Sequence, residues 1–502
     1  MTIDRAASVL GIDVGTSSLK AVLLDAGGAL IDEATVTYEV DSPQPGWTQQ
    51  DPSIWWFALR AALANLWARG RDPHTVAAIG LTGQMHSLVV LDGRGSVDCP
   101  AILWSDQRTH AECDEITTAI GRDDLLARTG NVVLPGFSAP KALWLRRHWP
   151  DAWEQARHLL LPKDYIRYRL TGGLVTDPSD ASGTVLFDVR ARRWAEDVAN
   201  VLGIPGAMLP DVAEGPVVTG YVRSDEADEL GLVAGTPVVA GGGDNAAAAV
   251  GLGAVEPGVL TLSLGTSGVI FAPLASYPPH PTGQVHVFCH AVPERWHLMS
   301  VTLSAGGSLH WLRGVLSEIL PVSGDGAYDW LVARAGSVEP GAGGVLFLPY
   351  LSGERTPFAD PDARGTLYGL HLGTGLGHVA RAVLEGVAFS QRQGLALMRA
   401  HGAKATVARG AGGGLASPLW RQILVDALGI DLQLADPRGG AARGAGVLAG
   451  MGAGIYADPS VGTDWSTRPI QHPDPAGQAA LEGPFRSYEA LYPALRQVWS
   501  SR

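Results

Sequence analysis

Short apolar runs separated by tight turns mark the start of the chain. Residues 8–12 and 19–24 are largely apolar, whereas residues 29–38 alternate apolar and polar side chains. Alternation with a period of two is typical of a strand with one face in water. Glycine-containing turns at 15–18 and 25–28 separate the three runs. We therefore expect a meander of three antiparallel strands.

Strands and helices alternate in the pattern that follows. Asp51-Pro52 is a helix-start signal, a capping carboxylate followed by proline, and apolar residues at helical spacing continue to Arg69. The further strands that we expect are 76–81, 88–91, 102–104, 158–161, 237–240, 259–264, 344–347 and 406–408. The further helices that we expect are 246–250, 305–312, 376–398, 419–428 and 441–450. This alternation predicts an α/β sheet protein.

One short motif occurs twice. SVLGIDVGTSS, near residue 8, resembles VLTLSLGTSGV, near residue 259. Both read as a strand, a Gly-Thr-Ser turn and a second strand. Two copies about half a chain apart suggest a duplicated fold with a cleft between the halves. Chance remains the alternative at this point, because a strand followed by Gly-Thr-Ser is a common pattern.

The composition is that of a globular protein with more than one domain. Of 502 residues, 46% are hydrophobic and 17% are charged, which excludes a disordered chain. This length exceeds what one core usually supports. The net charge of −13 argues against a nucleic-acid groove as the main surface. ATP stays compatible, because it needs only local donors and a metal ion.

Targeting features point to the cytoplasm. Cys99, Cys113 and Cys289 are scattered, with no CxxC motif, which is typical of a reduced compartment. The N-terminus MTIDRAASVLGID carries an early acidic residue and no long apolar core, so we expect no signal peptide. No uncharged apolar run reaches about 18 residues, so we expect no membrane span.

The two Gly-Thr-Ser turns are candidate phosphate sites. In such turns backbone N–H groups converge on an anion. In the first turn Thr16 and Ser17 add hydroxyl groups, Lys20 adds a charge, and Asp13 has the carboxylate that Mg²⁺ prefers. The second turn, 265–268, has the same pattern without a carboxylate. Ordinary hairpin turns are the alternative.

Two glycine-rich segments follow predicted strands. Residues 410–414 contain four glycines, an open backbone against which a flat purine can lie; a flexible loop is the alternative. Asp244 follows three glycines and opens a predicted helix, the place where α/β folds bind ligands. It could accept a proton from an attacking hydroxyl. Asp also caps helices well, so a capping role remains open.

Met85 and His86, with Trp104 and Asp106, form a candidate sugar site. Sugars need apolar area against their C–H faces and a few placed hydrogen-bonding groups. A single histidine such as His86 is more often structural. A second cluster, His286, Cys289 and His290, could hold a metal, but its strand-like setting favours core packing.

Several familiar motifs are absent from the sequence. No GxxxxGK[ST] sequence occurs, which excludes a P-loop enzyme. The protein-kinase motifs are also missing. Residues 444–449 match the dinucleotide pattern only loosely and follow no predicted strand, so we discount them.

With these pieces placed, the chain resembles the FGGY carbohydrate kinases, which share the fold of actin and hexokinase. The likeness runs from Ser8 to about Gly450. It rests on GIDVGTSSLK, GWTQQDPSIWW, GLTGQMHSLVVLD, PAILWSDQR, PGFSAPKALWLRRH, LLLPKDYIRYRLTG, VVAGGGDNAAAAVGLG, LSLGTSGV, RWHLMSV, FLPYLSGERTP and RAVLEGVAFS. Within the family, QMH at 84–86 and LPKDY at 161–165 favour bacterial xylulose kinases over glycerol or gluconate kinases.

The resemblance implies a fold and an activity. The fold is α/β, with two actin-like (ribonuclease H-like) domains and a central cleft: 1–245 on the sugar side and 246–502 on the nucleotide side. The activity is phosphorylation of D-xylulose by ATP with Mg²⁺ in the cytoplasm. The implied partners are the sugar and ATP, with no nucleic acid and no membrane. A homodimer is also implied, as in many similar proteins.

The resemblance also assigns residues to roles. Asp244 would take the proton from the sugar hydroxyl, and Asp13 would organise Mg²⁺, partly through water, together with the phosphates. The sugar contacts would be Met85, His86, Asp106 and Asn245. The residues at the phosphates and the nucleotide would be Thr16, Ser17, Lys20, Thr266, Gly306, Gly414 and Ser417.

The chain departs from the family pattern in three places. Ala142 follows Lys141 where a larger apolar residue is usual. Leu415 follows the triple glycine where Ala is usual, so adenine packing should differ slightly. The stretch after about Gly454 is longer than in compact members and has no role that we can assign.

Three other functions remain open. The nearest is an FGGY kinase for ribulose, a hexulose or a polyol such as xylitol, because sugar specificity rests on a few contacts. An ATPase chaperone or cytoskeletal protein of the same fold would need no sugar site. A pure sugar-binding module would leave both Gly-Thr-Ser turns unexplained.

Overall fold

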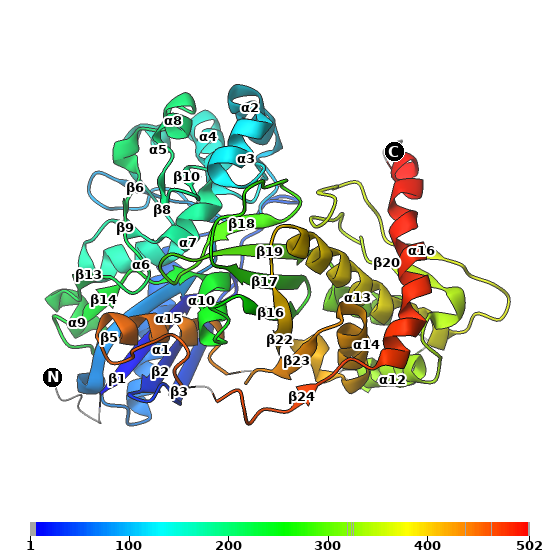
Figure 1. Cartoon of the computed structure of the whole chain (residues 1–502). Coiled ribbons are helices and arrows are strands. Elements are labelled where there is room, and N and C mark those ends of the chain that lie inside the picture. The colour runs from blue at the N-terminus through cyan, green and yellow to red at the C-terminus, as the bar shows by residue number, and fades with distance from the viewer. Residues whose placement is uncertain are drawn as a thin grey trace.

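The computed structural model describes residues 7–499 except 319, 323, 325, 437 and 463. Two α/β lobes lie side by side in Figure 1, the first coloured blue to green and the second green to red. Each lobe is built around its own seven-stranded sheet. The predicted α/β fold with two lobes is therefore confirmed.

The first sheet has the order β13-β14-β5-β1-β2-β3, with β15 beside the end of β5. β2 pairs antiparallel with both β1 and β3, so the predicted meander is confirmed, and β5 pairs parallel with β1. The strands are β1 (Ser8–Val14), β2 (Ser18–Asp25), β3 (Leu30–Thr37), β5 (Val76–Gly83), β13 (Val218–Tyr221), β14 (Pro237–Val239) and β15 (Gly242–Gly243).

The second sheet has the order β18-β19-β17-β16-β22-β23-β24. β17 pairs antiparallel with β16 and β19, and β22 pairs parallel with β16 and β23. The strands are β16 (Gly258–Leu264), β17 (Gly268–Leu274), β18 (His286–Cys289), β19 (Trp296–Thr302), β22 (Ala405–Ala411), β23 (Asp431–Leu434) and β24 (Ile470–Gln471).

The two sheets repeat one order of pairing. β1, β2 and β3 correspond to β16, β17 and β19, while β5 and β14 correspond to β22 and β23. In each lobe the first strand leads through a Gly-Thr-Ser turn into the second and pairs in parallel with a later strand. This repetition is the duplicated fold that the sequence repeat predicts, and it argues against chance.

Helices cover both sheets and fill the connections. In the first lobe they are α1 (Ser53–Ala68), α2 (His110–Ile120), α3 (Arg122–Thr129), α4 (Ser138–His148), α5 (Pro150–Gln155), α6 (Pro162–Thr171), α7 (Pro178–Ala181), α8 (Glu196–Val201), α9 (Ser224–Leu230) and α10 (Asp244–Gly251). Later in the chain they are α11 (Gly306–Val315), α12 (Gly326–Gly336), α13 (Leu376–Ala400), α14 (Pro418–Leu428), α15 (Gly440–Gly452) and α16 (Pro475–Trp499).

Short strand pairs stabilise the loops between these elements. They are β4 (Gln49–Gln50) with β7 (Ala101–Ile102), β6 (Val89–Asp92) with β8 (Ala156–Leu160), β9 (Val175–Thr176) with β12 (Asp211–Val212), β10 (Phe187–Asp188) with β11 (Arg193–Trp194), and β20 (Leu346–Leu348) with β21 (Thr366–Tyr368).

Residues of β1 alternate between two cores. Leu10 and Ile12 belong to a core shared with α1, whereas Val9 lies in a core with α10 and α15. Gly11 allows α15 to lie directly on the strand, because a Cβ there would sit 1.9 Å from the carbonyl oxygen of Ala442. Burial on both faces explains why β1 reads as a largely apolar run without the alternation seen at 29–38.

α15 follows β23 of the second lobe but packs on the first sheet, and the chain then returns to the second lobe. In Figure 1 the orange-to-red segment after α15 runs across to β24. Tyr456 ties this segment to the first lobe, because its hydroxyl donates to the carbonyl of Asp25 at 2.6 Å. The stretch after Gly454 therefore connects the lobes. The division of the chain at residue 245 stays a prediction.

Most expected elements lie within a few residues of their predicted positions. The helix expected after Asp51-Pro52 begins at Ser53, with Pro52 instead of Asp51 at the cap position, and the Asp51 carboxylate accepts from the amide of Ser53 at 2.8 Å. The strand expected at 102–104 is wrong in its second half: β7 ends at Ile102, and Trp104 lies in a turn. The strand expected at 344–347 begins only at Leu346.

The sequence analysis expected neither a membrane span nor a signal peptide, and the structure bears on the first of these. None of the helices in the described part of the chain is both long and apolar enough to cross a membrane. The prediction that the N-terminus carries no signal peptide falls partly on residues 1–6, which lie outside the described residues.

Candidate active site

Each Gly-Thr-Ser turn is closed by a hydrogen bond from its glycine. The amide of Gly15 donates to Ser18 O at 3.0 Å, and the amide of Gly265 donates to Ser267 O at 3.0 Å. A Cβ at Gly15 would lie 2.9 Å from Ser18 O, so the tight first turn requires glycine. The first turn is one residue longer than the second, but both join the first two antiparallel strands of their sheet and so occupy equivalent places in the two lobes.

Asp13 and Asp244 face one another closely enough to interact electrostatically. Asp13 lies near the end of β1, and its Oδ1 atom is buried without a hydrogen-bond partner among the described residues. Burial and the charge of Asp244 raise the pKa of Asp13 to about 7, although Lys20 acts in the opposite direction. A buried, unpartnered carboxylate oxygen is costly unless a ligand meets it.

Asp244 is the first residue of α10 and does not cap it. The cap position is Gly243, and the Asp244 carboxylate reaches only its neighbour. Its Oδ1 atom accepts from the Asn245 amide at 2.7 Å and from Asn245 Nδ2 at 2.8 Å. Burial raises the pKa of Asp244 to about 6 despite these two bonds. Since both bonds use one oxygen, the other oxygen remains available to a substrate.

The remaining residues of the first turn have mixed surroundings. Lys20 Nζ lies 3.6 Å from Glu33 Oε2, and Ser17 is exposed. Thr16 is already engaged, because its hydroxyl donates to Gln84 Oε1 at 3.2 Å and accepts from Trp104 Nε1 at 2.9 Å. Among the predicted phosphate residues of this turn, Ser17 is therefore the most accessible to a ligand.

His86 is buried, neutral and oriented. Burial lowers its pKa to about 3, although a hydrogen bond to Gly183 opposes this effect and Lys141 and Arg355 add to it. Nδ1 lies 2.8 Å from the Gly183 carbonyl oxygen, which can only accept. Nδ1 must therefore carry the proton, and Nε2 is left as an acceptor for a hydroxyl group.

Met85 and Asp106 differ in their surroundings. A Cβ at Gly243 would lie 2.9 Å from Met85 Cγ, so Met85 packs directly beside the segment that carries the catalytic candidate. Asp106 is fully buried; its carboxylate accepts from the Thr48 amide at 2.6 Å and pairs with Arg108 at 2.8 Å. Its assignment as a sugar contact remains a prediction.

Four predicted nucleotide residues line one pocket in the second lobe. It has a volume of about 760 Å³ and includes Thr266, Gly306, Gly414 and Ser417. The Gly306 amide donates to Gly265 O at 2.8 Å, which places the start of α11 against the second turn. A Cβ at Gly414 would lie 2.6 Å from Leu264 Cδ2, so glycine keeps this wall open.

The departures from the family pattern lie outside this pocket. Leu415 is buried and packs under Gly410, where a Cβ would lie 2.6 Å from Leu415 Cδ1. It does not line the 760 Å³ pocket, but it lines a second hollow of about 890 Å³ together with residues 410–413, so the expected change in adenine packing stays a prediction. Ala142 is buried in the core of the first lobe beside α4 and α2.

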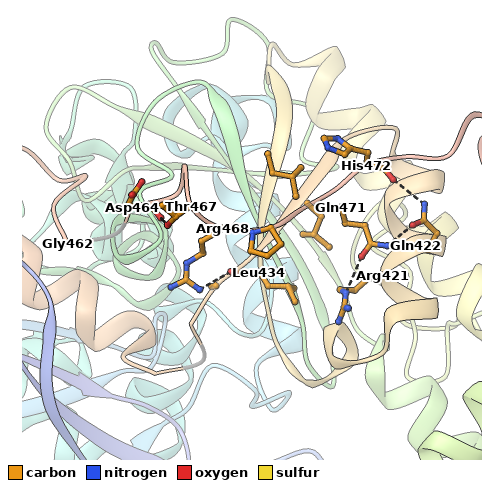
Figure 2. A pocket seen from close by; sticks show the side chains of 13 residues that line it. Arg421, Gln422, Leu434, Gly462, Asp464, Thr467, Arg468, Gln471 and His472 are labelled. Carbon is orange, nitrogen blue, oxygen red and sulfur yellow. Dashed lines mark hydrogen bonds between the residues drawn. The ribbon is translucent and has the colours of Figure 1, made fainter.

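A separate hollow of about 870 Å³ lies between α14, β24 and the segment that precedes β24. Figure 2 shows that its polar side chains bond to one another. Arg421 Nε donates to Gln471 Oε1 at 3.3 Å, and Gln471 Nε2 donates to Gln422 Oε1 at 2.6 Å. The hollow contains none of the predicted site residues. These lining side chains already use one another as hydrogen-bond partners, so we assign the hollow no chemistry.

The structure adds residues to which the sequence analysis gave no role. Gln84 accepts from the Thr16 hydroxyl, which itself accepts from Trp104, and the sequence showed Gln84 only as part of the QMH motif. Arg355 affects the pKa of both His86 and His286, and in the described structure its guanidinium donates no hydrogen bond. The local sequence pattern around Arg355 does not show that its guanidinium lies near His86, because the two residues are far apart in the chain.

His286, Cys289 and His290 belong to the core. His286 stacks on Phe288, and Cys289 is fully buried. In the described part of the chain no group of three His, Cys, Asp or Glu side chains is arranged to hold a metal ion. The core-packing interpretation therefore holds for this cluster.

Comparison with known proteins places these observations in a family. Residues 8–251 match the N-terminal domain, and residues 260–453 the C-terminal domain, of the FGGY family of carbohydrate kinases. A xylulose kinase from Escherichia coli (strain K12) is 42% identical over 453 residues, covering 90% of each chain.

Solved structures agree. A "xyloylose kinase" from Brucella ovis superposes with a TM-score of 0.91 at 39% identity, covering 98% of this chain and 100% of that one. A gluconate kinase from Lactobacillus acidophilus also has a TM-score of 0.91, at 25% identity, and covers 99% of both chains. The fold is thus shared by kinases whose names give different sugars.

Proposed function

Because the chain belongs to the FGGY family of carbohydrate kinases, we propose that it transfers the terminal phosphoryl group of ATP to D-xylulose, forming D-xylulose 5-phosphate. The observation that carries the proposal is the pair Asp13 and Asp244 beside the equivalent Gly-Thr-Ser turns of the two lobes. Curated xylulose kinases that are 33–42% identical over most of the chain support the choice of sugar.

The proposed reaction needs positioning and charge neutralisation more than covalent chemistry. Asp244 orients the attacking hydroxyl of the sugar through its free oxygen and accepts the proton as the bond to phosphorus forms. Its pKa of about 6 leaves the carboxylate mostly ionised at neutral pH, as a base requires. Thr266, with Ser17 and Lys20, lies where the phosphates of ATP would lie.

The residues present fit a magnesium ion. Asp13 offers a buried carboxylate oxygen that has no partner among the described residues, and Mg²⁺ takes one or two carboxylates together with phosphate oxygens and water. Bound with ATP, the ion would neutralise phosphate charge. The raised pKa of Asp13 means that its carboxylate binds protons readily without a cation, so a cation stabilises the ionised form.

Sugar recognition is assigned to the loop after β5 and its surroundings. His86 Nε2 accepts from a sugar hydroxyl, and Met85 supplies apolar area next to Asp244. Asn245 and Asp106 complete the proposed set, with Asp106 acting only if its present partners rearrange or share it. Another pentulose, a hexulose or xylitol is the alternative substrate, because specificity of this kind rests on few contacts.

An ADP-release assay with ATP and Mg²⁺ tests the proposal. The panel is D-xylulose, D- and L-ribulose, xylitol, glycerol, gluconate and fructose. We expect the highest kcat/KM for D-xylulose. A different best sugar would remove the substrate assignment but keep the kinase, and equal ADP release without any sugar would count against a sugar kinase of any kind.

Location and assembly follow from the family alone. We place the protein in the cytoplasm and propose a homodimer that binds neither nucleic acid nor membranes. Light scattering at micromolar concentration tests the dimer: a mass of about one chain would contradict it. Cell fractionation tests the location: recovery of the protein outside the cytoplasmic fraction would contradict it.

A further inference from the structure

Residues 241–243 are all glycine and connect β14 to Asp244. Glycine has the widest backbone freedom of any residue, so such a segment does not hold its own shape. A base that must meet a hydroxyl within hydrogen-bond reach has to be held to a fraction of an ångström. The segment must therefore be held by its neighbours: Gly242 and Gly243 pair with β5, the Gly241 amide donates to Gly215 O at 2.9 Å, and buried side chains hold the two ends.

Arg167 of α6 holds the beginning of the segment. Its Nη1 atom donates to the Val239 carbonyl at 2.6 Å and to Thr219 Oγ1 at 2.7 Å. Its Nη2 atom donates to the carbonyl of Ala240, the residue before the first glycine. A planar guanidinium that bonds two successive carbonyls sets the direction in which the chain leaves β14.

A directional chain of hydrogen bonds holds the end of the segment. The Gly243 amide donates to Ser179 Oγ at 3.0 Å, and the Ser179 hydroxyl donates to Asp177 Oδ2 at 2.5 Å. Because an amide can only donate, the hydroxyl must accept there and has its own proton left for Asp177. Beyond these two hydrogen bonds, Lys163 Nζ lies 3.0 Å from Asp177 Oδ1 and forms an ion pair with it.

Lys163 and Arg167 lie one turn apart on α6, in a fully buried ionic cluster with Asp164, Asp177 and Asp180. Burial, together with neighbouring aspartates, raises the pKa of Asp180 well above its usual range despite Lys163. Ionic clusters of this kind are costly to bury and often contribute more to specific geometry than to stability.

We propose that α6 is the positioning element of the catalytic centre, with Arg167 and the Lys163–Asp177–Ser179 chain holding the two ends of residues 241–243 and thereby Asp244. This inference rests on the proposed role of Asp244 as the base. The four side chains are positioning residues: Arg167 and Ser179 contact the backbone before the base, and Asp177 and Lys163 act through Ser179. The LPKDY motif, so far only a family marker, thereby acquires a physical role.

Ser179→Ala is the sharpest test, because it removes the bond to Gly243 and leaves every charge of the cluster in place. Ser182→Ala is the matched control. Ser182 is also buried, accepts from the Cys289 amide at 3.0 Å and donates to Pro178 O at 2.6 Å, but it does not touch the glycine segment.

We expect Ser179→Ala to lower kcat with D-xylulose about 10–100-fold, since a misplaced group of this kind costs up to about 10²-fold. KM for ATP should stay within about twofold of wild type, and Ser182→Ala should keep kcat within about twofold. The acid limb of the kcat profile should move to lower pH in Ser179→Ala, because a looser Asp244 gains water. Ser179→Ala does not alter Asp13 or Asp180, the other carboxyl groups near Asp244, so a shift of the acid limb reports on Asp244 itself.

Amide hydrogen exchange provides a readout that does not depend on activity. Peptides that span residues 239–246 should exchange faster in Ser179→Ala than in wild type or Ser182→Ala. If wild type shows no sugar-dependent turnover, the proposed function fails, while exchange still decides whether α6 holds the segment.

Two outcomes would overturn the inference. One is a Ser179→Ala enzyme with normal kcat and normal exchange. The other is equal loss in Ser179→Ala and Ser182→Ala, which would show general damage to the core. Should Ser179→Ala not fold, Asp177→Asn replaces it: it keeps an oxygen for Ser179 and removes the charge opposite Lys163. A normal kcat and normal exchange in Asp177→Asn would overturn the proposal equally.

Discussion

The loops after β5 and β22 occupy equivalent places in the two lobes but differ in character. In the first lobe the sequence is Thr-Gly-Gln-Met-His, ending at His86; in the second it is Ala-Gly-Gly-Gly, ending at Gly414. Their positions match, because Thr82 pairs with Asp13 on β1 and Ala411 pairs with Ser263 on β16. One scaffold therefore presents side chains in one lobe and bare backbone in the other.

The difference fits the roles proposed for the two loops, sugar binding in the first lobe and nucleotide binding in the second. A sugar is recognised through hydroxyl groups, which need placed donors and acceptors such as the neutral ring of His86. A purine is flat, and glycines let it approach the backbone. The strand before each loop differs too, since Asp13 supplies a carboxylate where the second lobe has Ser263. Charge for the reaction is therefore confined to the first lobe.

Removal of the base should have the largest effect. Asp244→Ala should lower kcat about 10²–10⁴-fold, the usual contribution of a general base, because the attacking hydroxyl loses the carboxylate proposed to orient it and accept its proton. Asp244→Asn keeps the size and a bond to Asn245, and it should lose as much. ADP release measures kcat and calorimetry measures ATP binding. A near-normal rate in either variant would remove Asp244 from the role.

Asp13→Ser gives the first hairpin the residue that the second hairpin has. We expect kcat to fall about 10–10³-fold, because phosphate charge loses its anchoring carboxylate and cation. Ser263→Ala, at the equivalent position of β16, should keep kcat within about twofold. Equal losses in the two variants would contradict the assignment of charge to one lobe.

The pH dependence should have opposite signs for activity and stability. kcat should rise as pH passes upward through 6 to 7, and at one unit below the pKa of about 6 only about one tenth of Asp244 is ionised. Asp13 and Asp244 have raised pKa values, so each binds more protons in the folded protein than in the unfolded chain from about pH 4 up to 6–7. Their contribution to the free energy of unfolding therefore falls as pH rises through this window.

Thermal unfolding of Asp13→Asn separates the two effects. This variant should melt above wild type at pH 8 and close to it at pH 5, because it removes one buried ionised group. Kinetic assays at the same pH values give the activity side. A wild-type enzyme that is more stable at pH 8 than the variant would show that ionised Asp13 does not destabilise the fold.

Filling the bare backbone of the second lobe should have the smallest effect. In Gly414→Ala the added Cβ would lie 2.6 Å from Leu264 Cδ2, so the loop must shift. We expect KM for ATP to rise about tenfold, the equivalent of modest overpacking, with little change in KM for the sugar. Gly314→Ala on α11, where a Cβ meets open space, is the control and should leave KM for ATP unchanged.

Local pattern predicted the elements well where one period dominates. The meander of β1, β2 and β3 and the long helix α13 appear close to their predicted bounds. The strand at 102–104 failed in its second half, because Trp104 turns to bond Thr16 and leaves the ladder. A contact between residues far apart in sequence decided that ending, and periodicity carries no information about it.

Some features of the candidate site could be predicted from the sequence, and others could not. Its residue types and the repeated turn were readable, and four predicted nucleotide residues line one pocket. The neutral His86 with an accepting Nε2 was not readable, because it depends on Gly183. Nor was the burial of Asp106 against Arg108, which leaves its sugar contact a prediction.

By itself, the sequence determined the hairpins, the glycine-bearing turns and the duplicated plan, because hydrophobic period and turn chemistry report local backbone geometry. Only the tertiary structure decided that Asp13 and Asp244 face each other, and that α6 holds the segment before the base. Proton affinity and position depend on desolvation and on charges that distant segments bring together. Those quantities exist only when the chain has folded.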